Sequence, residues 1–313
     1  MTTTAPFRDS SIRTEKVFGG ATLPKTLAPS DPAESGADAL AAGVRGQGVA
    51  LASLLRDHGA ILFRGFDVTG PAEFRRVVEA FGWDDMPYLG GAPRVKVDER
   101  VFTANEAPLD HYIKFHHEMA MMKEMPSKLF FFCLTPPGEG GATSVARSEA
   151  VVAEMERRAP EFVRRLSETG LVLDVEYPLE TSKDSVFGSS WKTVLGIDDP
   201  VLAEQRAFET MRCSTFEMTE EGTAKIRYGP FPVIETVQGR RIWLNNIDGP
   251  EMKMGDEAPV PQEAVEAYRN AFADVSVDVD WQKGDVLLVD NLSTQHARRP
   301  GKPPRKVLVS MCK

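Results

Sequence analysis

The alternation of hydrophobic and polar positions along the chain predicts short strands separated by helices and turns. Apolar runs between turn-forming residues predict buried strands at residues 60–66, 128–133, 240–245, 275–281, 285–290 and 306–311, with a further strand from Ala142. Apolar positions at helical spacing predict helices at residues 38–58, 71–81, 148–170 (broken at Pro160) and 261–273. The regular strand–helix–strand alternation of a doubly wound sheet is missing. The order of elements therefore favours a mixed α+β fold, with a β-sandwich or jelly-roll core and flanking helices.

Two parts of the chain lack a clear pattern. Residues 1–37 are rich in Pro, Ser, Thr and Gly, so we expect an N-terminal arm that lies over the core. Residues 172–230 hold polar loops, and we expect a long insertion above a site. Residues 38–313 then form one domain, because β-rich enzymes of more than about 200 residues are often single domains.

The composition is that of an ordinary globular protein and argues against several classes of function. Of 313 residues, 42% are hydrophobic and 27% are charged, and the net charge is -9. An acidic chain lacks the basic surface that nucleic acids or anionic membranes require, and the longest apolar run, residues 129–134, is too short to span a bilayer. We therefore expect a small-molecule substrate, with neither nucleic acid nor membrane as a partner. The oligomeric state is left open.

The cysteines and the N-terminus bear on the compartment. Cys133, Cys213 and Cys312 are far apart and odd in number, which favours a reducing environment without disulfides. The first residues contain no apolar segment of the kind found in secretion signals. We expect a cytoplasmic protein, although the Thr- and Ser-rich start leaves an organellar transit sequence open.

Only five histidines occur, and three of them fall within seven residues, at positions 111, 116 and 117. If residues 113–121 are extended, His116 and Glu118 lie on one face and His117 on the other. His296 follows a predicted strand and a polar turn, and it is the candidate third ligand. Two histidines and one carboxylate on one side of a metal leave open positions, the arrangement found in non-haem Fe(II) oxygenases. A zinc HExxH motif is excluded, because Met121 stands where its second histidine belongs.

A basic run after His296 offers an anion site in an otherwise acidic chain. It holds Arg298, Arg299, Lys302, Arg305 and Lys306. Arg305 is expected to open the last strand and to point its guanidinium into the barrel, where it pairs with a carboxylate. A 2-oxo dicarboxylate that chelates the metal at one end and binds arginine at the other fits this arrangement.

With these residues in place, the chain resembles the clavaminate synthase-like branch of the taurine dioxygenase family of Fe(II)/2-oxoglutarate-dependent oxygenases. The matching stretches include LFRGF at 62–66, TANE at 103–106, FHHE at 115–118, PSKLFFFC at 126–133, GGATS at 140–144, GDVLLVDN at 284–291 and PPRKVL at 303–308. The likeness covers residues 50–313 and is strongest to plant clavaminate synthase-like proteins. It implies a double-stranded β-helix (jelly roll) and a reaction of O2 and 2-oxoglutarate that gives succinate, CO2 and an oxidised, by default hydroxylated, small polar substrate.

The resemblance also implies roles for individual residues. His116, Glu118 and His296 are the iron ligands, and Arg305 binds the distal carboxylate of 2-oxoglutarate with help from the Thr143 hydroxyl. Asn105 is a weaker candidate for binding co-substrate or substrate. Glu118 retains the carboxylate that halogenating relatives lack, so halogenation is not expected.

Other residues carry weaker hypotheses. Arg298, Asn245 and His111 are candidate substrate contacts, whereas we expect a structural role for His117 and simple packing for Met119 and its neighbouring methionines. Two other functions remain open at this point. One is a cupin-like metal-dependent dioxygenase or isomerase that uses no 2-oxoglutarate, and the other is a non-catalytic small-molecule binding protein.

Overall fold

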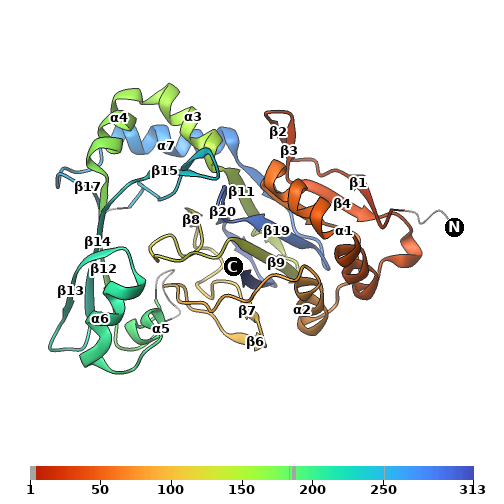
Figure 1. Cartoon of the computed structure of the whole chain (residues 1–313), viewed down its shortest axis with the longest axis horizontal. Coiled ribbons are helices and arrows are strands. Elements are labelled where there is room, and N and C mark those ends of the chain that lie inside the picture. The colour runs from red at the N-terminus through yellow and green to blue at the C-terminus, as the bar shows by residue number, and fades with distance from the viewer. Residues whose placement is uncertain (1–4, 183, 185–187, 250) are drawn as a thin grey trace.

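A mixed eight-stranded sheet is the largest element of the computed structural model, which describes residues 5–182, 184, 188–249 and 251–313 (Figure 1). From edge to edge its strands are β1 (Phe7–Ser10), β4 (Lys25–Pro29), β5 (Ala60–Phe63), β19 (Val286–Asp290), β9 (Lys128–Thr135), β22 (Lys306–Cys312), β7 (Val101–Thr103) and β6 (Lys96–Asp98). Neighbouring strands are antiparallel except β4 and β5, which are parallel. The sheet therefore joins both ends of the chain into one core.

The central strands are apolar throughout because both faces of the sheet are covered. In β9, Phe130 and Phe132 pack with one hydrophobic cluster, while Leu129, Phe131 and Cys133 pack with another. Successive side chains of a strand point to opposite faces, so a strand buried on both sides shows a continuous apolar run. The run at 128–133 thus marks the middle of the sheet.

Helices α1 (Ala37–His58) and α2 (Pro71–Glu79) cover the first of these faces (Figure 1). The expected end of α1 is confirmed: Gly59 adopts a left-handed conformation with φ 77° and donates its N–H to Leu55. Pro71 begins α2, where its missing N–H costs no helical hydrogen bond. Both helices agree with the sequence prediction to within two residues.

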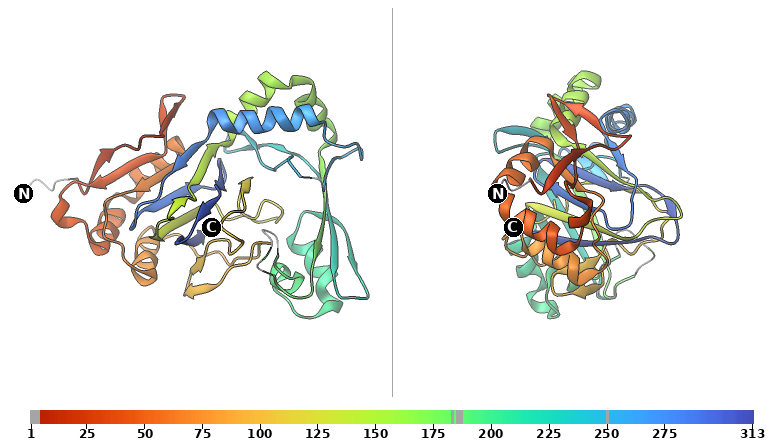
Figure 2. Two further views of the ribbon diagram at one scale, coloured as in Figure 1. Left: turned by 180° about the vertical axis from the view of Figure 1, so that it is seen from behind. Right: turned by 90° about the vertical axis from the view of Figure 1, so that its right-hand side faces the viewer.

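A four-stranded antiparallel sheet packs over the other face and carries the functional residues. Its order is β18 (Val277–Val279), β11 (Thr143–Arg147), β20 (Thr294–Arg298) and β8 (Ile113–His116). Side chains from both sheets meet in one hydrophobic cluster, among them Phe131, Val145 and Val309. Outside this sheet lie helices α3 (Ser148–Arg158), α4 (Pro160–Thr169) and α7 (Gln262–Val275), with α3 and α7 side by side in both views of Figure 2. The break at Pro160 and the helix near 261–273 were both expected.

The remaining elements form smaller units around these two sheets. They are β2 (Lys16–Phe18) with β3 (Ala21–Leu23), β10 (Glu139–Gly140) with β21 (Gly301–Lys302), β15 (Ile234–Val237) with β16 (Arg240–Trp243), and the 3-10 turn Pro32–Glu34. A second four-stranded sheet has the order β13 (Cys213–Met218), β14 (Ala224–Phe231), β12 (Leu171–Tyr177) and β17 (Met252–Met254), accompanied by α5 (Trp191–Leu195) and α6 (Pro200–Thr210).

Three sequence expectations differ from the structure. Residues 172–230, expected as polar loops, form most of the β12–β14 unit, where buried Ala224, Ile226 and Tyr228 alternate with Lys225 and Arg227. Residues 1–37, expected as an arm, supply β1 and β4 at the edge of the main sheet in their described part. The extended segment expected at 113–121 ends at His116, and a turn follows.

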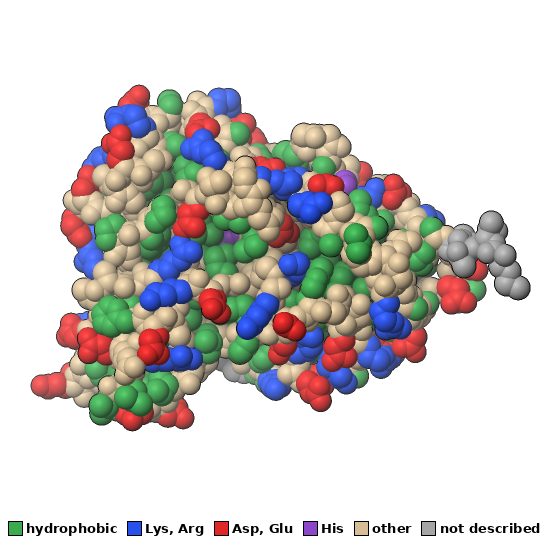
Figure 3. Space-filling model, viewed as in Figure 1, with side chains coloured by type: hydrophobic (Ala, Val, Ile, Leu, Met, Phe, Trp, Pro, Cys, Tyr) green, Lys and Arg blue, Asp and Glu red, His purple; other side chains and the backbone are tan. Residues whose placement is uncertain are grey.

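The surface agrees with the modest negative net charge. On the face shown in Figure 3, basic and acidic side chains are interspersed over the whole molecule. Within the described ranges, no helix combines the length and apolar character needed to cross a membrane.

Candidate metal centre

His116, Glu118 and His296 lie together at one end of the four-stranded sheet. His116 ends β8 and stands directly opposite His296 in the register of β20. The rings of the two histidines are 4.3 Å apart between centroids, and the Nε2 atom of His296 is 3.7 Å from Oε2 of Glu118. One nitrogen or oxygen from each of the three residues lies within 4.8 Å of the others. Three potential ligands from segments 180 residues apart therefore converge on one point.

Glu118 reaches this point from a turn, because the strand has already ended. Met119 has a φ of 59°, a left-handed conformation that is uncommon for residues other than glycine. The strand alternation used to pair His116 with Glu118 is thus wrong in detail. The two side chains converge because the backbone turns immediately after His117.

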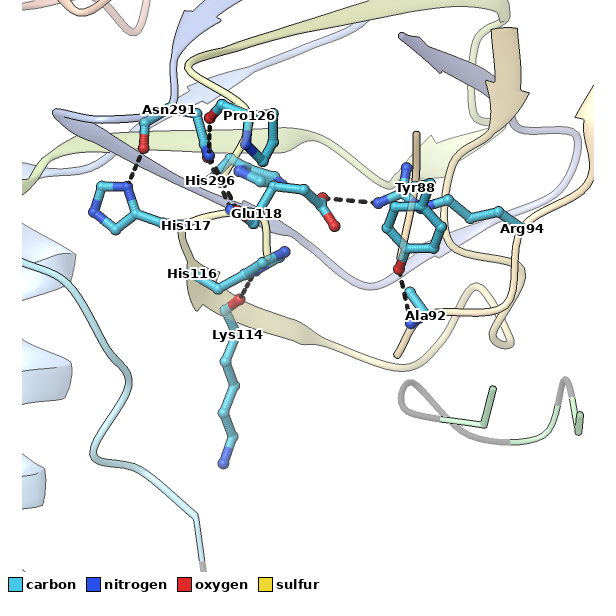
Figure 4. A network of polar contacts seen from close by, with 10 residues as sticks. All are labelled: Tyr88, Ala92, Arg94, Lys114, His116, His117, Glu118, Pro126, Asn291 and His296. Carbon is cyan, nitrogen blue, oxygen red and sulfur yellow. Dashed lines mark hydrogen bonds and ion pairs between the residues drawn. The ribbon is translucent and has the colours of Figure 1, made fainter. Parts of the chain in front are cut away.

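His117 points away from the cluster, as expected for a structural residue (Figure 4). The side chain is 1% exposed, and it contacts the Asn291 carbonyl oxygen through Nδ1 and the Ser148 hydroxyl through Nε2 at 2.8 Å. Burial lowers the pKa of His117 to about 4, so the ring is neutral at pH 7. The hydrogen bonds fix its orientation and thereby direct the two flanking residues to the opposite side.

Asn291 holds the turn that carries Glu118 (Figure 4). Its side-chain oxygen accepts the Glu118 N–H at 2.8 Å, and its amide group donates to the carbonyl oxygens of Glu118 and Pro126 at 3.1 and 2.8 Å. The side chain is completely buried, so no water replaces these bonds if they are lost. Asn291 follows β19 directly and thus ties the main sheet to the metal-centre turn.

Replacing Asn291 with alanine is expected to lower the free energy of unfolding by about 3 kcal/mol, because each buried polar group left unpaired costs about 1–3 kcal/mol. Urea denaturation measures this loss. Ser310→Ala is the matched control, since the Ser310 hydroxyl is also fully buried but has no hydrogen-bond partner among the described residues. Equal stability of Asn291→Ala and the wild type would show that the Asn291 hydrogen bonds do not stabilise the turn.

The charges of the three residues suit a divalent metal. Burial raises the pKa of Glu118, but the charge of Arg94 and the neighbouring His296 outweigh it and hold the pKa well below the usual range of a carboxyl group. Burial and the adjacent His116 lower the pKa of His296 to about 4. At pH 7 the carboxylate is therefore ionised and the imidazole of His296 is neutral, the states in which both bind metal.

The hydrogen bonding of His116 completes this donor set. Nδ1 of His116 lies 2.8 Å from the Lys114 carbonyl oxygen, so Nδ1 donates to that oxygen and Nε2 is the nitrogen available to a metal. Two imidazoles and one carboxylate match the donor set of non-haem Fe(II) centres with open positions. The residues present therefore fit an iron ion.

A small cavity of about 50 Å³, open to solvent on one side, adjoins His116 and His296. Besides His116 and His296, its lining side chains are Ala92, Arg94, Ala104, Asn105, Ile113, Phe131, Thr143, Ala297, Arg298, Arg305 and Val307. None of these is acidic, and three are arginines. The cavity is thus built to receive an anion next to the metal-binding atoms.

Arg305 and Thr143 lie together on one wall of this cavity. The Nε–H of Arg305 donates to the Gly141 carbonyl oxygen at 2.9 Å, and its terminal nitrogen is 3.5 Å from the Thr143 hydroxyl. Trp281 also donates to that hydroxyl, at 3.1 Å. Burial and the nearby charge of Arg298 lower the pKa of Arg305 to about 10. Among the described residues Arg305 has no carboxylate partner. The sequence predicts that Arg305 opens the last strand, and in the structure it is the residue just before β22, which begins at Lys306.

The remaining candidates occupy different positions. Arg298 donates hydrogen bonds to four backbone carbonyl oxygens of residues 105–111, so its guanidinium orders that loop. Asn105 belongs to the same loop and lines the cavity, while its side-chain oxygen accepts the Ala107 N–H at 2.9 Å. His111 is exposed, and Asn245 is buried beside Trp243, but neither lines the cavity.

The sequence interpretation did not identify Arg94, Asn291 or Trp281. Arg94 is a single arginine in the irregular segment between α2 and β6, and no spacing relates it to Glu118. Asn291 stands at the end of the quoted stretch GDVLLVDN, but its bonds to Glu118 span 173 residues. Both roles depend on contacts that only the folded chain creates.

Two histidines and a carboxylate beside a cationic cavity match the kind of site found in non-haem iron oxygenases. The family model described as "Taurine catabolism dioxygenase TauD, TfdA family" matches residues 27–312, so the chain belongs to this family and is an oxidoreductase of the dioxygenase class. The chain is 44% identical to a clavaminate synthase-like protein of Arabidopsis thaliana over 279 residues, 84% of each chain. These findings confirm the resemblance stated from the sequence.

A more distant relative matches in sequence, and solved structures match in fold. The dapdiamide synthesis protein DdaC of Enterobacter agglomerans is 22% identical over 292 residues, which cover 82% of this chain and 83% of the relative. The crystal structure of PvcB from Pseudomonas aeruginosa superposes with a TM-score of 0.58 at 16% identity, covering 98% of this chain and 91% of that chain. An asparagine oxygenase in complex with Fe(II), 2S,3S-3-hydroxyasparagine and succinate gives a TM-score of 0.55 at 16% identity, covering 88% and 83%.

Proposed function

We propose that this protein is an Fe(II)- and 2-oxoglutarate-dependent dioxygenase that hydroxylates or otherwise oxidises a small polar substrate and releases succinate and CO2. One observation carries the proposal: His116 and His296, which cluster with Glu118, line the same cavity as Arg305, an arginine without a carboxylate partner among the described residues. The family membership and the neighbours named for iron and 2-oxoglutarate chemistry support it. The cupin-like alternative does not explain Arg305.

In this proposal His116, Glu118 and His296 hold the iron, and Arg305 with Thr143 binds the distal carboxylate of 2-oxoglutarate. Bound iron and 2-oxoglutarate supply the oxidising chemistry of the reaction. The chain contributes two imidazoles, an ionised carboxylate and a fixed guanidinium to this site. Apolar side chains such as Phe131 and Val307 limit the water in the cavity, which strengthens the pairing between Arg305 and a carboxylate.

Asn105 has a smaller role in the same proposal. It lies on the loop that Arg298 orders, and its side chain borders the cavity. We assign it to the binding of co-substrate or substrate, and Arg298 to shaping the cavity entrance. His111 and Asn245 stay weaker candidates for substrate contact.

The proposal extends to fold and compartment. The eight-stranded and four-stranded sheets serve as the two faces of a double-stranded β-helix with flanking helices, in a single domain in which β1 and β4 join the elements of residues 38–313. Cys133, Cys213 and Cys312 form no disulfide, which fits a cytoplasmic protein.

An anaerobic titration with Fe(II) and then 2-oxoglutarate tests the proposal. We expect a weak visible charge-transfer band that saturates with 2-oxoglutarate, because the 2-oxo acid chelates iron held by the three ligands. Succinate release then identifies substrates. Iron binding without the band would favour the cupin-like alternative. Binding of a small molecule without succinate formation would favour the non-catalytic alternative.

A further inference from the structure

Trp281 contacts the cavity wall formed by Arg305 and Thr143, and the proposed function gives this contact no role. The indole Nε1–H of Trp281 donates to the Thr143 hydroxyl oxygen at 3.1 Å, and the two residues are only 6% and 4% exposed. Trp281 itself is not among the side chains that line the cavity. It therefore reaches the cavity only through Thr143.

The hydrogen bonds of the Thr143 hydroxyl leave its proton free. A hydroxyl group has one proton to donate and two lone pairs that accept. Trp281 donates to the oxygen of Thr143, and a terminal nitrogen of Arg305 lies 3.5 Å from the same oxygen. Both neighbours are N–H donors, and among the described residues the hydroxyl donates to no acceptor. Its proton is therefore available to an acceptor in the cavity, beside the Arg305 guanidinium.

The register of the four-stranded sheet brings Trp281 and Thr143 together. Thr143 begins β11 and stands opposite Val279 of β18, and Trp281 follows Val279 by two residues. On its other side, Thr143 pairs with Arg298 of β20. The indole thus approaches the Thr143 hydroxyl from the end of the neighbouring strand.

An ion pair fixes the turn that carries Trp281. Arg64 binds both carboxylate oxygens of Asp285, at 3.0 and 2.6 Å, and also donates to the Asp280 carbonyl oxygen at 2.7 Å. The same carboxylate accepts the Gln282 N–H at 2.8 Å, and its side chain is 1% exposed. A buried, two-pronged pair between a guanidinium and a carboxylate has a well-defined geometry. The backbone is therefore held on both sides of Trp281.

We propose that Trp281 is a positioning residue for the co-substrate: its indole N–H occupies a lone pair of the Thr143 hydroxyl and directs the hydroxyl proton toward the distal carboxylate at Arg305. The inference rests on the proposed function and deepens it. A hydroxyl that turned its proton away would present oxygen lone pairs to the carboxylate and repel it. Trp281 prevents that orientation, because an N–H donor already faces the oxygen from that side.

The binding of two 2-oxo acids tests this role without turnover. 2-Oxoglutarate has a distal carboxylate, whereas 2-oxobutyrate carries the same 2-oxo acid end and lacks that carboxylate. Calorimetry on the protein loaded with Mn(II) measures both affinities. In Trp281→Phe we expect 2-oxoglutarate to bind about three- to tenfold more weakly, as for the loss of one hydrogen bond, and 2-oxobutyrate to bind as in the wild type.

Trp191→Phe is the matched control. Trp191 is also a buried tryptophan, and its Nε1–H donates to the Gly222 carbonyl oxygen at 3.0 Å, but it lies in α5 and does not line the cavity. Both affinities are expected to equal those of the wild type. An equal loss of 2-oxoglutarate affinity in Trp191→Phe and Trp281→Phe would attribute the effect to general loosening of the fold and overturn the assignment.

A double-variant cycle shows whether Trp281 acts through Thr143. Thr143→Val removes the hydroxyl and keeps the branched shape of the side chain. If the indole positions that hydroxyl, adding Trp281→Phe to Thr143→Val causes no further loss of 2-oxoglutarate affinity. Losses that multiply, an equal loss for both 2-oxo acids, or unchanged 2-oxoglutarate affinity in Trp281→Phe overturns the assignment.

An NMR measurement on the wild type decides the question if Trp281→Phe does not fold. In the protein loaded with diamagnetic Zn(II), the indole N–H signal of Trp281 is identified among those of the four tryptophans as the one that Thr143→Val shifts most. We expect 2-oxoglutarate to shift this signal and 2-oxobutyrate to leave it in place, because only 2-oxoglutarate accepts the Thr143 proton. Equal responses to the two acids, or no response to 2-oxoglutarate, would exclude the role of Trp281.

The wild-type titration separates this inference from the proposed function on which it rests. Failure of 2-oxoglutarate to bind wild-type protein that holds Mn(II) overturns the proposed function, and the role of Trp281 with it. Binding of 2-oxoglutarate by the wild type, together with the same affinity in Trp281→Phe, removes only the role of Trp281.

Discussion

Alanine at His116, Glu118 or His296 is expected to weaken Mn(II) binding by more than about 100-fold and to abolish succinate formation. Loss of residues that only support a metal ligand costs about 10- to 100-fold in affinity, so loss of a ligand itself costs more. Each substitution removes one of the three groups that lie within 4.8 Å of one another. Calorimetric titration with Mn(II) measures the affinity, and coupled assays measure succinate.

The three variants need separate controls because their side effects differ. Glu118→Ala also leaves the buried Arg94 without its carboxylate, so it destabilises the fold as well as the metal site. Glu118→Gln preserves shape and hydrogen bonding and isolates the loss of charge. His58→Gln is the matched histidine control, since His58 ends α1, bonds to Thr22 and belongs neither to the cluster nor to the cavity lining. Wild-type Mn(II) affinity in His116→Ala or His296→Ala would exclude that residue as a ligand.

Arg305→Gln is expected to weaken 2-oxoglutarate binding by about 10- to 100-fold while metal binding stays unchanged. A hydrogen-bonded pair between a buried guanidinium and a carboxylate contributes roughly 1.5–3 kcal/mol, and glutamine supplies neither the charge nor the two-pronged geometry. The intensity of the charge-transfer band at increasing 2-oxoglutarate measures the affinity. Lys302→Ala is the control from the same basic run, because Lys302 is exposed and pairs with Glu139.

The pKa of Arg305 gives the same assignment a pH dependence. Burial and Arg298 lower this pKa to about 10, so the guanidinium is charged below that pH and loses its proton as the pH rises through it. Affinity for 2-oxoglutarate is therefore expected to stay constant from pH 7 to about 9 and to fall above pH 10. Unchanged affinity in Arg305→Gln would show that another residue binds the distal carboxylate.

The sheet core was predictable because its physical cause is local. The run KLFFFC has no polar position, and such a strand must be covered on both faces, as β9 is. Gly59 and Pro160 likewise determine where helices end and begin through their own backbone conformation. The β12–β14 unit was missed, although AKIRYGPF alternates apolar and polar residues. Its strands are half-exposed, and weak alternation within polar surroundings does not distinguish a strand from a loop.

The candidate site also has parts that the sequence predicts and parts that only the fold reveals. From residue types and family likeness the sequence predicts His116, Glu118, His296, Arg305 and Thr143 as site residues. In the folded chain the first three cluster, and all but Glu118 line one cavity. The reason given for the pairing of His116 with Glu118 was wrong, since a turn held by Asn291 replaces strand alternation. Arg298, considered as a substrate contact, is engaged with backbone carbonyl oxygens of the loop it orders.

By itself the sequence determined which chemical groups are available and which segments form the buried strands, because both follow from residue type and short-range periodicity. Only the tertiary structure decided which groups meet. The pairing of Arg94 with Glu118, the hold of Asn291 on the metal-centre turn, and the support of Thr143 by Trp281 join residues 24, 173 and 138 positions apart. Such contacts arise from the packing of two sheets, and no local pattern in the chain encodes their geometry.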